Sequence, residues 1–220
     1  VDPSEVAKDC SKLLQSWDMS FKSSPTSSYV VGQVWGVKAP KLYLLHQVRA
    51  RMDFADTLSA VREVSKLFPA AREKLVEDKA NGPAVMRQLR DEIGGFIPVS
   101  PDQGAGSDAD KEARLSAVSW LFKAGDIQLP DPKAFKKNEW VNNYVVELTL
   151  FPSVSNDDQV DATSQALIRL QEVLKVSSLV PIGVGRQKSW RREWGWVDTS
   201  RPFPSDRPSK GLYWEASRRS

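Results

Sequence analysis

Three of the acidic sites in the chain, widely separated in sequence, each lie near the expected start or end of a regular element. Carboxylates repel one another unless a cation lies between them, and a divalent metal ion is the usual cation in proteins. If the fold brings the three places together, the sequence predicts a metal-dependent enzyme that hydrolyses phosphodiester bonds. The acidic residues are Asp18, the pair Glu77 and Asp78, and the group Asp157, Asp158 and Asp161.

The sequence around the first two places narrows their roles. Asp18 lies in the apolar run 13–19, where a charged group without a partner is costly. Neighbouring side chains in a strand point to opposite faces, so only one of Glu77 and Asp78 is expected to be a direct ligand.

The third acidic group opens the amphipathic segment 157–174. Acidic residues at a helix start commonly cap backbone N–H groups and interact favourably with the helix dipole, and this is one expected role of Asp157. Asp158 and Asp161 are three residues apart and share a helix face. Both are therefore candidate metal ligands.

Length and composition describe one globular core, or a core with a small appendage. The chain has 220 residues, of which 40% are hydrophobic, and no run approaches the ~20 apolar residues of a membrane span. The single cysteine, Cys10, excludes an internal disulfide. The chain has no Gly-x-x-x-x-Gly-Lys-Ser/Thr motif, so no P-loop nucleotide site is expected. The only histidine, His46, lies in a strand-like run without a Ser or Cys nucleophile motif, and we interpret it as structural.

Charge is unevenly distributed along the chain. The net charge is +3, but residues 181–220 hold nine Lys/Arg and four Asp/Glu, so the basic excess lies in the tail. This tail is also rich in Trp and Pro and has no regular period. We expect a folded domain over residues 1–176 and an extended C-terminal extension over residues 177–220. Such a tail either binds nucleic acid or a protein partner, or is simply solvated.

Hydrophobic periodicity predicts a mixed α/β architecture. Three strands should form an antiparallel meander, and two later strands should join it by right-handed crossovers, parallel to the first. The fourth strand can then lie beside the first, which makes Asp18 and Glu77 neighbours and places the last helix across them. This is the layout of an RNase H-like fold. The expected strands are 13–21, 29–38, 42–52, 74–78 and 96–99, and the expected helices are 53–68 with Asp53 as its cap, 83–93, 111–124, 135–150 and 157–174, with a mobile loop at 100–110 and an extended piece at 126–130.

Six short motifs follow one another along the chain: SWDMSFK (16–22), VEDKANG (76–82), DKEAR (110–114), FKAGDIQLP (122–130), ELTLFP (147–152) and DDQVDA (157–162). In this order they resemble the C-terminal nuclease domain of the large terminase subunit of tailed bacteriophages, within the RNase H-like and RuvC-like superfamily. The resemblance covers residues 13–170 and does not extend into the tail.

The resemblance implies a metal-dependent endodeoxyribonuclease that cuts concatemeric viral DNA during genome packaging in the host cytoplasm. Its substrate would be double-stranded DNA, and two Mg²⁺ or Mn²⁺ ions would be its cofactors. The family's full-length subunit carries an N-terminal ATPase motor that this sequence lacks, so we expect the isolated nuclease domain. Its other partners would be the portal and the small terminase subunit, with no membrane involved. We expect low sequence specificity, because no base-reading element stands out.

The resemblance also assigns roles to the acidic residues. Asp18 would bridge the two ions, and Asp18, Glu77 and Asp158 would be the catalytic residues. Glu77 matches the family's acidic position, and Asp78 stays the alternative. The Asp-x-x-Asp-Ala pattern also resembles the last helix of RuvC-type resolvases, where both acids serve the metal site. The implied metal ligands are therefore Asp18, Glu77, Asp158 and Asp161.

Two basic residues beside the expected mobile loop, Lys111 and Arg114, lie one helical turn apart. They would contact phosphates of the cut DNA strand, although a solvated helix face explains them equally well. Two other functions stay open. A resolvase-like nuclease would prefer Holliday junctions to linear duplex, and a non-catalytic packaging or docking module would bind no metal.

Overall fold

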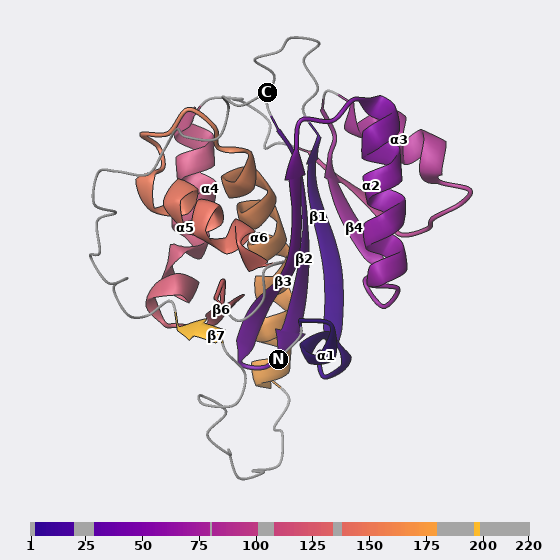
Figure 1. Ribbon diagram of the computed structural model, residues 1–220. Helices are drawn as coiled ribbons and strands as arrows, with labels where there is room; N and C mark the ends of the chain where they lie inside the picture. Colours follow the sequence, from indigo (N-terminus) through magenta and orange to yellow (C-terminus); the bar gives the residue numbers. More distant parts are fainter. Residues whose placement is uncertain are drawn as a thin grey trace, which may run out of the picture.

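The structure is a computed structural model that describes residues 3–19, 29–79, 81–100, 108–133, 138–179 and 196–198. Within these residues a seven-stranded sheet has helices on both faces (Figure 1). In chain order the elements are α1 (Pro3–Lys8), β1 (Lys12–Met19), β2 (Val30–Lys38), β3 (Lys41–Ala50), α2 (Phe54–Leu67), β4 (Glu73–Glu77), α3 (Gly82–Leu89), β5 (Phe96–Val99), α4 (Asp108–Lys123), β6 (Ile127–Pro130), α5 (Trp140–Leu150), α6 (Asp158–Leu179) and β7 (Trp196–Asp198).

The sheet is mixed, with strand order β5-β4-β1-β2-β3-β6-β7. Strands β1, β2 and β3 form the predicted antiparallel meander. Strand β4 pairs with β1 in parallel, and β5 pairs with β4 in parallel. A right-handed crossover through a helix is the usual way to reach such a neighbouring parallel position. The predicted α/β fold, an RNase H-like mixed sheet flanked by helices, is therefore confirmed.

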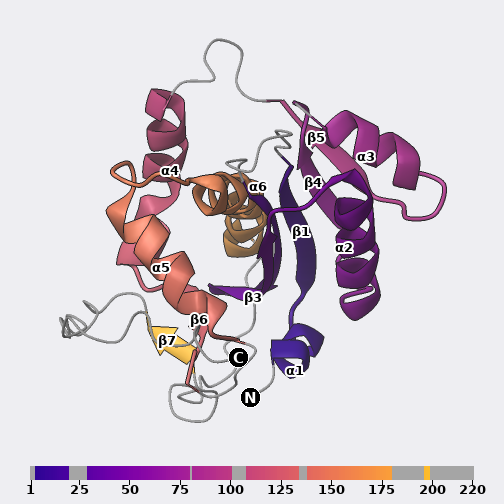
Figure 2. The same cartoon turned by 45° about the horizontal axis from the view of Figure 1, so that its top comes forward.

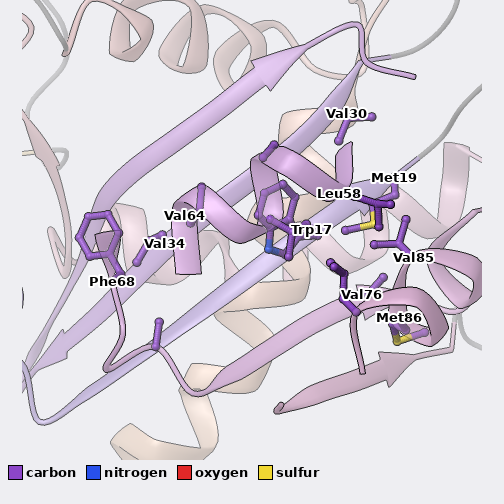
Figure 3. Packing of buried hydrophobic residues seen from close by; sticks show 14 of the residues in the cluster. Trp17, Met19, Val30, Val34, Leu58, Val64, Phe68, Val76, Val85 and Met86 are labelled. Carbon is purple, nitrogen blue, oxygen red and sulfur yellow. The ribbon is translucent and has the colours of Figure 1, made fainter. Parts of the chain in front are cut away.

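Both faces of the central sheet are buried, and this explains why β1 and β2 carry so many apolar residues. On one face Trp17 and Val34 pack with residues of α2 and α3 (Figure 3). On the other face Leu14 and Trp35 pack with residues of α4, α5 and α6. The two groups of helices lie on opposite sides of the sheet in Figure 2. Trp17 lies across Gly32, where an added Cβ would come within 2.3 Å of the indole ring.

The bounds of the elements agree with the prediction in some places and differ in others. Asp53 caps α2 as predicted, because its side chain accepts a hydrogen bond from the amide of Asp56 at 2.8 Å. Helix α3 ends at Leu89 rather than at residue 93, and the amide of Ile93 then donates to the carbonyl of Leu89 at 2.7 Å. The piece expected to be merely extended forms β6, which pairs with β3 in parallel. The short helix α1 was not predicted.

Parts of some predicted elements lie outside the described residues. These parts are the end of the first strand, most of the loop 100–110, the first residues of the helix expected from 135, and nearly all of the extension 177–220. The boundary at residue 176 therefore stays a prediction. Of the extension, the end of α6 and β7 are described, and β7 pairs antiparallel with β6. No helix in the described part of the chain is both long and apolar enough to span a bilayer.

Candidate metal centre

Asp18 and Glu77 lie at the carboxyl ends of neighbouring parallel strands. The register pairs Trp17 of β1 with Val76 of β4. The next residues are Asp18 on β1 and Glu77 on β4, so the two carboxylates lie side by side where these strands end. We call this end of the sheet the acidic edge. This is the arrangement that the predicted crossover requires.

The alternation of side chains selects Glu77 over Asp78. Leu14 and Leu75 both belong to the core cluster on the α4, α5 and α6 side. Residues two or four positions further along a strand point to the same face, so Asp18 and Glu77 share that side of the sheet. Asp78 follows the strand and is exposed. Glu77 is therefore the better placed of the two acids.

Helix α6 brings the third acidic group to the same edge. The side chain of Asp158 accepts a hydrogen bond from the amide of Tyr29 at 3.2 Å, and Tyr29 directly precedes β2. Because β2 runs antiparallel to β1, its first residues lie opposite the end of β1, and the register pairs Asp18 with Val31. The three separated acidic places thus meet in the fold.

Asp18 shows most clearly that negative charge is crowded at this edge. The residue is only 6% exposed, and its pKa is raised well above the usual range. Burial is the largest cause, and the charges of Asp161, Asp158 and Glu77 add to it. Lys111 acts in the opposite direction. A cation bound near Asp18 would favour the ionised carboxylate.

Asp158 is as deeply buried as Asp18, at 5% exposure. Burial is the main cause that raises its pKa, and the charge of Asp157 adds to the shift. The amide of Tyr29, with Arg49 and Lys111, acts to lower the pKa of Asp158. Its environment therefore mixes one fixed hydrogen-bond donor with charges of both signs.

Two cationic side chains of α4, Lys111 and Arg114, lie over the acidic start of α6, and we call them the α4 cations. The Nζ of Lys111 is 2.7 Å from an Oδ2 of both Asp157 and Asp161. The Nη2 of Arg114 is 2.6 Å from Oδ1 of Asp161. Burial opposes the charge of Lys111, but its hydrogen bonds to these two carboxylates more than offset burial, and its pKa is raised. The α4 cations thus neutralise part of the acidic group.

The residues at this edge fit a hard divalent cation in chemical type. In the described residues no three acidic, His or Cys side chains converge closely enough to hold one ion. Asp157 and Asp161 are instead paired with the α4 cations, and Glu77 pairs with Lys79 at 3.0 Å. The side chains are all carboxylates, however, and oxygen ligands are those that Mg²⁺ and Mn²⁺ prefer.

The predicted structural role of His46 agrees with its position. It lies in β3, and its ring centroid is 5.7 Å from that of Phe68. Phe68 belongs to the core cluster of the α2 and α3 side, which is the sheet face opposite to the acidic residues.

The sequence patterns assign no role to Glu147 or Arg49, yet Glu147 contacts the start of α6 and Arg49 contacts Glu147. Glu147 accepts a hydrogen bond from the amide of Gln159 at 2.7 Å, and Arg49 lies 3.2 Å from Glu147. One signal was present in the sequence. Glu147 follows Val141 and Tyr144 at three-residue steps on the buried face of α5, where a carboxylate is rare unless it has partners.

The sheet topology and the acidic edge define an RNase H-like domain. The profile of the terminase RNase H-like domain family matches residues 15–170, and the chain belongs to this family. The resemblance to the C-terminal nuclease domain of the large terminase subunit is thereby confirmed. No curated protein is similar enough in sequence to count as a relative.

Solved structures support the same assignment of the fold. The large terminase nuclease from thermophilic phage G20c with bound zinc is 17% identical over 70% of this chain and 79% of that chain, with a TM-score of 0.52. The same nuclease with bound magnesium is 15% identical over 72% of this chain and 81% of that chain, also with a TM-score of 0.52. At this level of identity the similarity shows the shared nuclease-domain fold.

Proposed function

We propose that this domain is a metal-dependent DNA endonuclease that cuts concatemeric viral DNA during genome packaging. The observation that carries the proposal is the meeting of Asp18, Glu77 and Asp158 at one edge of an RNase H-like sheet. Membership of the terminase family supports the choice of DNA as substrate.

The proposed ligands of two Mg²⁺ or Mn²⁺ ions are Asp18, Glu77, Asp158 and Asp161. Such ions activate a water molecule and stabilise the leaving oxygen when they are bound. The magnesium and zinc bound by the phage G20c nuclease support a divalent ion here. Asp18 lies among the charges of the other three acids, and this position supports Asp18 as the residue that would hold both ions.

The α4 cations have a proposed second role toward DNA. Lys111 and Arg114 are paired with Asp157 and Asp161, and Asp161 is itself a proposed ligand. If Asp161 held a metal ion, Lys111 and Arg114 would lose part of their counter-charge and would become available to DNA phosphates. A lysine and an arginine suit phosphate oxygens as a point charge and a fork.

The proposed biological setting is that of the terminase complex in the host cytoplasm. The partners would be double-stranded DNA, the ATPase motor of the same subunit, the portal and the small terminase subunit. The domain alone would cut with low sequence specificity, since phosphate contacts carry no sequence information directly.

The proposal is tested by plasmid cleavage with Mg²⁺, with Mn²⁺ and with EDTA. The wild-type domain should nick and linearise supercoiled plasmid only with metal. Asp158→Asn should lose cleavage, while Asp78→Asn is a matched control because Asp78 is an exposed acid beside the site. If the domain cleaves with neither Mg²⁺ nor Mn²⁺, this result would count against nuclease activity of the domain. A strong preference for four-way junctions would favour a resolvase.

A further inference from the structure

A chain of hydrogen bonds crosses the buried interface between the sheet and helices α5 and α6. The indole Nε1 of Trp35 donates to Gln33 at 2.9 Å. The side-chain amide of Gln33 donates to Gln47 at 2.9 Å, and Gln47 donates to Gln159 at 2.6 Å. Gln159 in turn donates to the carboxylate of Glu147 at 2.5 Å. We call these five residues the amide chain.

The direction of the amide chain is fixed at both ends. An indole N–H can only donate, and at the other end both carboxylate oxygens of Glu147 accept hydrogen bonds, from Gln159 and Arg49. Turning any one of the three glutamine amides around would bring two donors or two acceptors together. All of these polar groups are buried, so each mismatch would leave an unsatisfied group, and hydrogen bonds in such a setting reinforce one another.

Glu147 at the end of the amide chain also holds the start of α6. Its second carboxylate oxygen accepts from the backbone amide of Gln159 at 2.7 Å. The first four amides of a helix have no partner within the helix, so Glu147 of α5 caps α6 from outside. Arg49 lies 3.2 Å from Glu147 and holds its carboxylate from the sheet side.

The residues fixed in this way belong to the first turn of α6. Asp158 directly precedes Gln159, and Asp161 follows it by two residues. The hydrogen bond from Tyr29 reaches Asp158 from the β2 side. The first turn is therefore held from α5 by Glu147 and from the sheet edge by Tyr29.

We infer that Glu147 is a positioning residue of the candidate metal centre: it caps α6 and closes the amide chain, and so it holds Asp158 and Asp161 toward Asp18. The inference rests on the proposed metal-dependent function. Glu147 itself points into the α5–α6 interface and is not a proposed ligand. Partners that orient metal ligands typically change metal affinity 10- to 100-fold when they are removed.

The test uses Glu147→Ala, the isosteric Glu147→Gln and the control Tyr144→Phe. Tyr144→Phe removes another α5–α6 hydrogen bond, 3.2 Å long between the hydroxyls of Tyr144 and Thr163, but leaves the first turn of α6 untouched. Glu147→Gln keeps the side-chain volume, yet its amide must place a donor against a donor of Gln159 or Arg49. Glu147→Gln should therefore not restore wild-type Mn²⁺ affinity. If Glu147→Ala does not fold, Glu147→Gln alone tests the positioning role of Glu147.

Mn²⁺ affinity by calorimetry and hydrogen exchange of the Gln159 amide are the two measurements. Both Glu147 variants should bind Mn²⁺ about 10- to 100-fold more weakly than wild type and lose protection of the Gln159 amide. Tyr144→Phe should change neither. Unchanged Mn²⁺ affinity or a protected Gln159 amide in Glu147→Gln would overturn the inference, whereas a wild-type domain that binds no Mn²⁺ would overturn the proposed function itself.

Discussion

Removal of the Lys111 ammonium should destabilise the metal-free domain much more than the metal-bound one. Lys111→Met keeps most of the aliphatic stem and removes two hydrogen bonds of 2.7 Å, to Asp157 and to Asp161. A buried hydrogen bond to a charged group contributes about 1.5–3 kcal/mol. The Lys111 side chain is 22% exposed, so solvent screening reduces this value. We expect a loss of about 2–3 kcal/mol for the pair of bonds.

The melting temperature in EDTA at pH 7 measures this loss. For a chain of this size 1 kcal/mol corresponds to about 2–4 °C, so the melting temperature should fall by roughly 4–12 °C. The pKa of Lys111 is raised on folding, so its stabilising contribution is complete below the ordinary lysine pKa of about 10.4 and is lost only as pH rises through the raised value. At pH 7 the full contribution is therefore measured.

The same variant in Mn²⁺ provides the decisive comparison. A bound ion can replace the ammonium as the counter-charge of the acidic group, so the difference from wild type should shrink. Lys12→Met is a matched control, because Lys12 is 24% exposed and lies 2.6 Å from Glu73, in an ion pair that involves none of the acidic residues of the candidate metal centre. Its loss should be the same with and without Mn²⁺. An equal loss for Lys111→Met in EDTA and in Mn²⁺ would refute the reasoning.

Two further predictions concern the site and the core. The pKa of Asp18 is raised on folding, so its protonated form stabilises the metal-free domain at low pH, and this stabilisation is lost as pH rises through the raised pKa. In EDTA the melting temperature of Asp18→Asn should therefore fall less steeply with rising pH than that of the wild type. Identical dependence on pH in the two proteins would count against crowded charge at Asp18. Gly32→Ala should destabilise the domain by about 1–3 kcal/mol in urea, because its Cβ would meet Trp17 at 2.3 Å, whereas Gly94→Ala, with no atom within 4 Å, should not. Equal midpoints for these two variants would contradict the packing described here.

The acidic edge could be predicted because local patterns indicated the strands and a right-handed crossover allows β4 to lie beside β1. Once β4 was expected beside β1, Asp18 and Glu77 had to become neighbours. The place of Asp158 in the first turn of the last helix could be predicted because Asp157, Asp158 and Asp161 indicate a helix start. Periodicity and the ends of elements support these inferences, and the resemblance to the terminase family supplied the roles of Glu77, Asp158 and Asp161.

Contacts between distant polar residues could not be predicted in the same way. The hydrogen bonds from Gln33 to Gln47 and from Gln47 to Gln159 join three separate elements, and no spacing in the sequence announces them. Strand β6 was expected only as an extended piece. Its pairing with β3, which covers a short stretch, was not predicted.

In the proposed function, the three separated acidic places form one metal centre. Calorimetric titration of Mn²⁺ into the wild-type domain and into Asp18→Asn, Glu77→Gln, Asp158→Asn and Asp78→Asn tests it most directly. The first three variants should each weaken Mn²⁺ binding strongly, and Asp78→Asn should bind as wild type does. Wild-type affinity in Asp18→Asn or Asp158→Asn would contradict the claim.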